Sequence, residues 1–192
     1  MNRIIFIIFA AAFHLIGCEK QDSSNKFPKL TFRHDSNLLS NLVKHEYFSF
    51  FPPKGFFLID EEKHEKIKIE IENSINSYFK VKVLGIYENL NGVVIIISKV
   101  QGENSIFNLL SDVFESDLAL AFGLPKVNRG QFLTNNIETV QFIRSNENII
   151  NYKIFFDVLN QTGFQIDFFV PKERFTKFQN KMESSISTFN LN

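Results

Sequence analysis

Pairs and runs of apolar residues inside strand-like segments are the feature that most restricts the fold of this chain. Phe155-Phe156 and Phe168-Phe169 interrupt the usual alternation of apolar and polar residues, and residues 93–97 are apolar without a break. Neighbouring residues of a strand point to opposite faces, so each pair places one phenylalanine on each face. An exposed phenylalanine would forgo roughly 1.5–3 kcal/mol of burial free energy. The pattern therefore predicts a sheet covered on both faces, either by helices or by helices on one side and a partner or ligand on the other.

The strands expected in this sheet are short and connected mostly by tight turns. Residues 80–87 and 92–100 flank Glu88-Asn89-Leu90-Asn91, a sequence that indicates an antiparallel hairpin. Residues 138–145, 149–158 and 163–170 are separated by Asn- and Gly-containing turns and predict a three-stranded meander. Upstream, residues 47–60 predict a strand that Pro52-Pro53 breaks before a second short extended piece.

Three segments carry apolar residues at helical spacing. They are residues 61–78, residues 106–121 and a C-terminal segment, 172–189. A further short helix is expected near residues 36–43, with Asp35 or Ser36 as its cap. With 192 residues, 44% of them hydrophobic, the chain suits one α+β domain over residues 27–192. We expect an antiparallel sheet of about five to six strands with helices packed on its faces.

The N-terminus has the organisation of an export signal. One arginine is followed by a nearly unbroken apolar run from Ile4 to Ile16, which is too short to span a bilayer as a helix. Leu15-Ile16-Gly17-Cys18 then resembles the lipobox of bacterial lipoproteins, and Cys18 is the only cysteine of the chain. The resemblance implies that signal peptidase recognises Leu15, Ile16 and Gly17, that residues 1–17 are removed and that Cys18 carries diacylglycerol. The alternative is a buried cysteine at the end of a core helix.

Residues 18–26 are polar after the cysteine and predict a flexible tether between lipid and domain. The protein would be exported and held on a membrane through Cys18, because acylation with more than one chain gives stable attachment. The residue after the cysteine is Glu19, whereas an aspartate at this position would resemble an inner-membrane retention signal. The glutamate therefore favours the outer membrane over the inner membrane. The formal net charge is zero and the charges are spread along the chain, so we expect no nucleic-acid partner.

The domain resembles the PsbP/Mog1/DcrB-like family of α/β/α sandwiches. The matching features are the PPKGF sequence at 52–56, the early helix and hairpin, the meander, and a last helix that ends ESSISTF at 183–189. This resemblance covers roughly residues 46–190. It implies an accessory or assembly factor that is not an enzyme, and several bacterial members of the family are lipoproteins.

No catalytic, metal or cofactor motif stands out. His34, His45 and His64 lie outside any recognisable hydrolase or metalloprotease pattern, and there is no Gly-rich phosphate loop. We therefore assign no catalytic residue, no metal ligand and no cofactor, and we regard enzymatic activity as the least favoured option. Asp157 and Asp167 are expected on one face of neighbouring strands with Lys153, close enough for an ion pair or for a polar floor of a groove.

Two segments are candidates for partner binding. One is the rigid corner with Pro53, Lys54 and Phe56, and the other is the expected loop at 123–136 with Lys126, Arg129 and an exposed Phe132. The leading hypothesis is a lipid-anchored binding or assembly module of the cell envelope that contacts another envelope protein. The alternative is a carrier that holds an apolar small ligand in a Phe-lined cavity.

Overall fold

A computed structural model describes residues 28–73, 79–102, 128–158 and 162–192. A seven-stranded antiparallel sheet runs through this part of the chain in the order β3-β4-β5-β9-β8-β7-β6. Its strands are β3 (Phe57–Leu58), β4 (Phe79–Glu88), β5 (Val94–Gly102), β6 (Asn128–Thr134), β7 (Ile137–Ser145), β8 (Ile149–Val158) and β9 (Thr162–Pro171). The expected hairpin is β4 and β5, and the expected meander is β7, β8 and β9.

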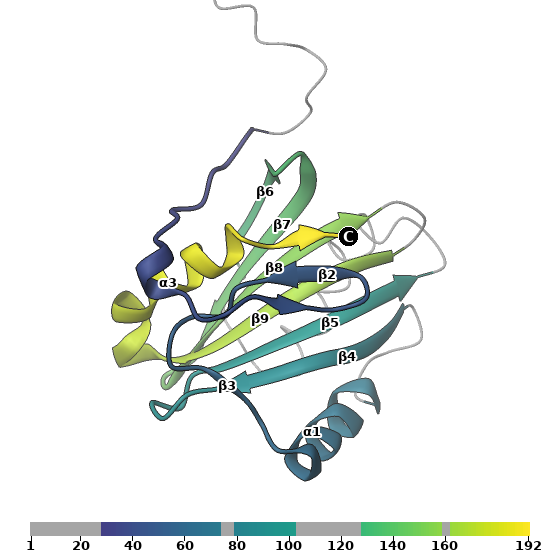
Figure 1. Cartoon of the computed structure of the whole chain (residues 1–192), viewed down its shortest axis with the longest axis vertical. Coiled ribbons are helices and arrows are strands. Elements are labelled where there is room, and N and C mark those ends of the chain that lie inside the picture. The colour runs from purple at the N-terminus through teal and green to yellow at the C-terminus, as the bar shows by residue number, and fades with distance from the viewer. Residues whose placement is uncertain (1–27, 74–78, 103–127, 159–161) are drawn as a thin grey trace, which may run out of the picture.

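A second, smaller sheet and two α-helices accompany the large sheet. The small sheet has the order β1-β2-β10, from β1 (Val43–Lys44), β2 (Phe48–Phe50) and β10 (Asn190–Leu191). The helical elements are η1 (Ser36–Leu38), α1 (Glu61–Asn73), η2 (Lys172–Arg174) and α3 (Phe175–Ile186). Figure 1 shows α3 and the small sheet side by side over the large sheet, while α1 lies beyond β4.

The larger part of the core lies between the large sheet and the layer formed by α3 and the small sheet. Aromatic rings fill this layer by packing on one another: Phe189 stacks on Phe156 with 4.3 Å between ring centroids and on Phe48 with 5.4 Å. From α3, Phe178 and Met182 are buried in the same cluster. The spacing that predicted the C-terminal helix therefore marks the face that α3 buries.

The opposite face of the sheet is also buried. Ile67 and Ile71 of α1 pack against a cluster that includes Ile86 and Ile96. Farther along the same face, Phe155 is fully buried and its ring lies across Gly163, where a Cβ atom would sit 2.1 Å from the ring. Only glycine fits beneath that ring. Phe155 and Phe156 thus lie on opposite faces and are both buried, at 0% and 1% exposure.

The expected α+β class, with an antiparallel sheet and helices on its faces, is confirmed. Two local expectations are wrong. The sheet has seven strands within the described residues instead of about five to six, because part of the segment expected as a loop at 123–136 forms β6 on β7. The short helix near 36–43 is only the turn η1, and residue 43 already belongs to β1. Helix α1 (Glu61–Asn73) confirms the described part of the helix expected at 61–78, and residues 74–78 and the helix expected at 106–121 lie outside the described residues.

Candidate functional site

The segment that leads from the expected tether into the domain crosses the β6–β7 turn and the end of α3. We call residues 28–35 the leading segment. Its backbone bonds to β6, where the Leu30 amide donates to the Leu133 carbonyl and the Leu133 amide donates to the Pro28 carbonyl, each at 2.9 Å. Phe32 is buried edge-on against Phe132 of β6, with 5.7 Å between ring centroids. The leading segment is therefore fixed to the domain from its first described residues.

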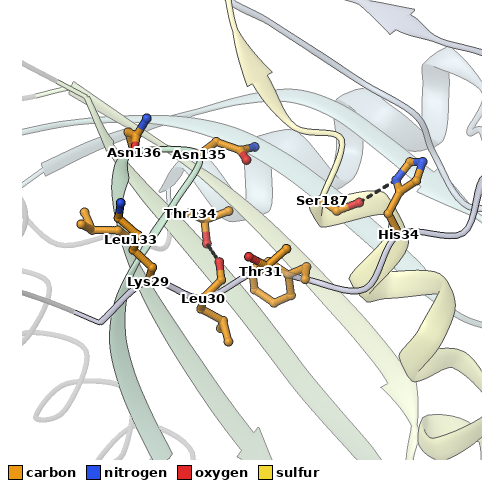
Figure 2. A pocket seen from close by; sticks show the side chains of 10 residues that line it. Lys29, Leu30, Thr31, His34, Leu133, Thr134, Asn135, Asn136 and Ser187 are labelled. Atoms are coloured by element: carbon orange, nitrogen blue, oxygen red, sulfur yellow. Dashed lines mark hydrogen bonds between the residues drawn. The ribbon is translucent and has the colours of Figure 1, made fainter. Parts of the chain in front are cut away.

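An open groove of about 250 Å³ lies between the leading segment, the β6–β7 turn and Ser187 (Figure 2). The turn places Asn135 and Asn136 at φ of 52° and 62°, and Thr134 pairs directly with Ile137. Two consecutive positive φ values define the two-residue turn that suits the twist of a hairpin, and asparagine adopts them at little cost. The groove therefore presents amides and hydroxyls on a rigid frame.

His34 and Ser187 lie at one end of this groove and bond to each other. The distance from His34 Nδ1 to Ser187 Oγ is 3.0 Å, and Ser187 Oγ donates its proton to the Ser184 carbonyl at 2.7 Å. Since a hydroxyl has one proton, His34 Nδ1 must donate to Ser187 and cannot accept its proton here. The arrangement does not activate a nucleophile. It ties the leading segment to the end of α3, together with the bond from the Asp35 amide to Ser184 Oγ at 3.1 Å.

A buried ion pair lies on the opposite face of the sheet from α3. Lys153 Nζ of β8 is 3.2 Å from Asp167 Oδ1 of β9, as their expected neighbouring positions predict, and Asn151 Nδ2 donates to the same oxygen at 3.2 Å. Burial lowers the pKa of Lys153, an effect that Asp167 opposes. Arg144 is 6% exposed on this face, and burial lowers its pKa too. Since β8 and β9 are central strands, these charges belong to the interior.

Asp157, near the end of β8, supplies a pH-dependent prediction. Partial burial and the nearby charge of Glu138 raise its pKa from 3.8 to about 6. The folded state therefore favours the protonated carboxyl, and ionisation above pH 6 costs stability. We expect Asp157→Asn to stabilise the protein at pH 7.5, by about 1 kcal/mol or less because solvent screens a half-exposed group. The gain should vanish at pH 4, as measured by urea denaturation at both pH values. A gain of equal size at pH 4 would contradict this ionisation argument.

The predicted partner-binding residues lie at separate places. Phe132 is 5% exposed, so its expected exposure is wrong: β6 turns it inward against Phe32. Phe56 packs edge-on against Phe178 of α3, and Pro53 is also buried, whereas Lys54 is exposed. Arg129 is partly buried on β6. Lys126, and the lipobox residues Leu15, Ile16, Gly17 and Cys18, lie outside the described residues. A role of these residues in partner binding or lipidation stays a prediction.

Exposed apolar residues that the sequence did not single out gather at the opposite end of the strands from the β6–β7 turn. Leu90 is 94% exposed in the β4–β5 turn, and Ile149 is 43% exposed where β8 begins. Phe57, 46% exposed, pairs with Glu88 just before the β4–β5 turn. In the sequence, Leu90 lies between two turn-forming asparagines, Asn89 and Asn91. An apolar residue in such a turn was the signal that could have indicated its exposure.

The described residues also bear on metal and membrane binding. Among them, no group of three or more His, Cys, Asp or Glu side chains is placed to hold a metal ion. Within the same ranges, no helix has the length and the apolar character needed to cross a bilayer.

Comparison with known proteins gives a likeness in fold. The chain matches no protein-family model, and no curated protein matches it either. The solution structure of cyanobacterial PsbP (CyanoP) from Synechocystis sp. PCC 6803 superposes with a TM-score of 0.51 at 11% identity, covering 79% of this chain and 92% of that one. The fold is PsbP-like. At this identity the likeness concerns the fold alone, and the PsbP-like fold confirms the α/β/α arrangement expected from the sequence.

Proposed function

We propose that this protein is a lipid-anchored lipoprotein of the cell envelope that acts as a non-enzymatic accessory or assembly module. The observation that carries the proposal is the lipobox Leu15-Ile16-Gly17-Cys18 after a short apolar run, followed by a polar tether. Cys18 would become the first residue of the mature protein and its attachment point. Attachment to the outer membrane is favoured over the inner membrane because Glu19 follows the cysteine.

Three features of the domain support a binding role over catalysis or ligand transport. The His34–Ser187 pair holds the leading segment in place and leaves Ser187 without a base. The Lys153–Asp167 pair is interior. The layer where a carrier would hold an apolar ligand is filled by stacked rings, with Phe189 in contact with Phe48 and Phe156. A PsbP-like fold is compatible with an accessory role.

The test of the anchor is the replacement of Cys18. We expect Cys18→Ala to abolish incorporation of an alkyne-labelled fatty acid and to leave the unprocessed precursor, because the thiol is the acceptor of diacylglycerol. Labelling is read on gels after expression in a bacterial host that processes lipoproteins, and Ser23→Ala in the tether is the matched control that should label normally. Labelling that persists in Cys18→Ala would refute the lipoprotein proposal.

A further inference from the structure

The leading segment is held by few contacts for its length. Among residues 28–34, only Phe32 is buried and the others are exposed. Lys29 forms a single parallel bridge with Leu133 at the outer edge of β6. By contrast, β8 pairs with β7 on one side and with β9 on the other along most of its length. Segments with few buried apolar side chains open at a smaller free-energy cost than central strands do, so the leading segment should open first.

The chain is held firmly immediately after the leading segment. The Ser40 amide donates to the Pro52 carbonyl at 2.8 Å. The Lys54 amide donates to the Leu38 carbonyl at 2.7 Å. Between these two bonds, the Leu39 side chain is buried, with 8% of its surface exposed. A movement of the leading segment would therefore end at η1, and the chain beyond η1 would stay in place.

The end of α3 holds two different parts of the chain with separate pairs of hydroxyl groups. Ser185 Oγ donates to the Phe51 carbonyl at 2.7 Å, and Thr188 Oγ1 accepts from the Phe51 amide at 3.0 Å. Ser184 and Ser187 bond instead to the leading segment. Because Ser185 and Thr188 keep α3 attached to the strand region before Pro52, release of the leading segment would leave α3 on the domain.

The buried ring in the middle of the leading segment links its two ends. Phe32 lies two residues after Leu30 and two residues before His34. Its ring is the only one of the leading segment in the main core cluster, so it supplies most of the apolar contact. Leu30 and His34 are exposed, and hydrogen bonds at exposed positions are readily exchanged for bonds to water. Departure of Phe32 from its site would therefore release both ends together.

We propose that the leading segment is a strap that opens as one unit, about a hinge at η1, while the rest of the domain stays folded. In the closed state the strap supplies half of the residues that line the groove (Figure 2). These residues are Lys29, Leu30, Thr31, Phe32 and His34. Opening would uncover the side of Phe132 that Phe32 contacts and the backbone of Leu133 at the edge of β6. The groove therefore exists only while the strap is closed.

This proposal goes beyond the proposed function, because opening of the strap does not depend on acylation of Cys18. Hydrogen exchange of the purified protein, followed by NMR, tests it. The amides of Leu30, Leu133 and Asp35 each donate across the contact between strap and domain. Their protection factors should agree within about threefold and should lie at least about 10-fold below those of β8 and β9. A wider spread among the three amides, or a smaller difference from β8 and β9, would overturn the proposal.

A change at one end of the strap tests whether the two ends open together. His34→Ala removes the bond to α3, and exchange should become faster at the far end too, by about 2- to 10-fold for Leu30 and Leu133, as expected for one hydrogen bond. Arg33→Ala, which alters an exposed neighbour in the same segment, is the matched control and should leave these rates unchanged. Acceleration confined to the Asp35 amide would overturn the proposal.

A change in the core tests whether the strap opens without unfolding of the domain. Ile154→Val shortens a fully buried side chain of β8. It should speed exchange in β8 and β9 by about 2- to 10-fold. The three strap amides should keep their rates, because the loss in the core is the same whether the strap is open or closed. Equal acceleration of the strap amides would mean that the strap opens only with the whole domain, which would overturn the proposal.

Discussion

Replacing Phe189 with alanine is expected to lower the free energy of unfolding by about 3–5 kcal/mol. The ring is fully buried and joins the layers of the domain: it stacks on Phe156 of the large sheet at 4.3 Å and on Phe48 of the small sheet at 5.4 Å. Its removal leaves a cavity between rings that β8 and β2 hold in place. The backbone around it has little room to collapse, which favours the upper part of this range.

Urea denaturation followed by circular dichroism measures this loss. The slope with denaturant should stay the same, so that the change appears in the midpoint. The matched control is Phe57→Ala, which removes a phenylalanine that is 46% exposed on β3 and should cost much less. A loss below about 1.5 kcal/mol for Phe189→Ala would mean that the aromatic layer repacks, contrary to the fixed stacking described above.

Replacing Asp167 with alanine is expected to lower the free energy of unfolding by about 3–5 kcal/mol, because the change removes the carboxylate that pairs with the buried ammonium of Lys153. Only 12% of the Lys153 side chain is exposed, and Asp167 Oδ1 is also the acceptor for Asn151. Chemical denaturation at pH 7 measures the loss. The exposed pair Lys68–Glu65 on α1 is the control, and Lys68→Ala should leave the midpoint close to that of the wild type.

A double variant separates the effect of losing the ion pair from the effect of changing the packing at positions 153 and 167. Lys153→Met combined with Asp167→Leu removes both charges and keeps apolar volume, so it should recover most of the stability that Asp167→Ala loses. If the double variant were as unstable as the single one, the loss would come from strand packing and not from the loss of the ion pair.

The sequence predicted the central strands well because their side-chain pattern carries information about both faces. Phe155-Phe156 and the run at 93–97 require a covered sheet, and the structure buries both phenylalanines. The ion pair of Lys153 and Asp167 was also predictable, since the meander places the two residues on one face of neighbouring strands. Strand β6 was not, because its sequence, with Gly130 and several polar residues, resembles a loop until β7 pairs with it.

The candidate sites were less predictable, because exposure depends on residues distant in sequence. Phe132 was expected to be exposed, and it lies in the main core cluster with Phe32 of the leading segment packed edge-on against it. The end of the sheet opposite the β6–β7 turn also depends on tertiary contacts: Asn91, Asn148 and η2 come from three segments that hydrogen bonds join. A single apolar residue in a turn does not indicate a binding site until its neighbours in space are known.

The sequence alone determined the class of the domain and the residues that face its two sides, because strand and helix periodicities are local properties of the chain. It also carries the whole case for the lipid anchor, which stays a prediction. Only the tertiary structure decided that Phe132 is buried, that His34 bonds to Ser187, and that the β4–β5 and β7–β8 turns are both joined to η2. Which side chains are buried, which groups bond to each other, and which turns are joined all depend on contacts between segments far apart in the chain. No local sequence pattern encodes them.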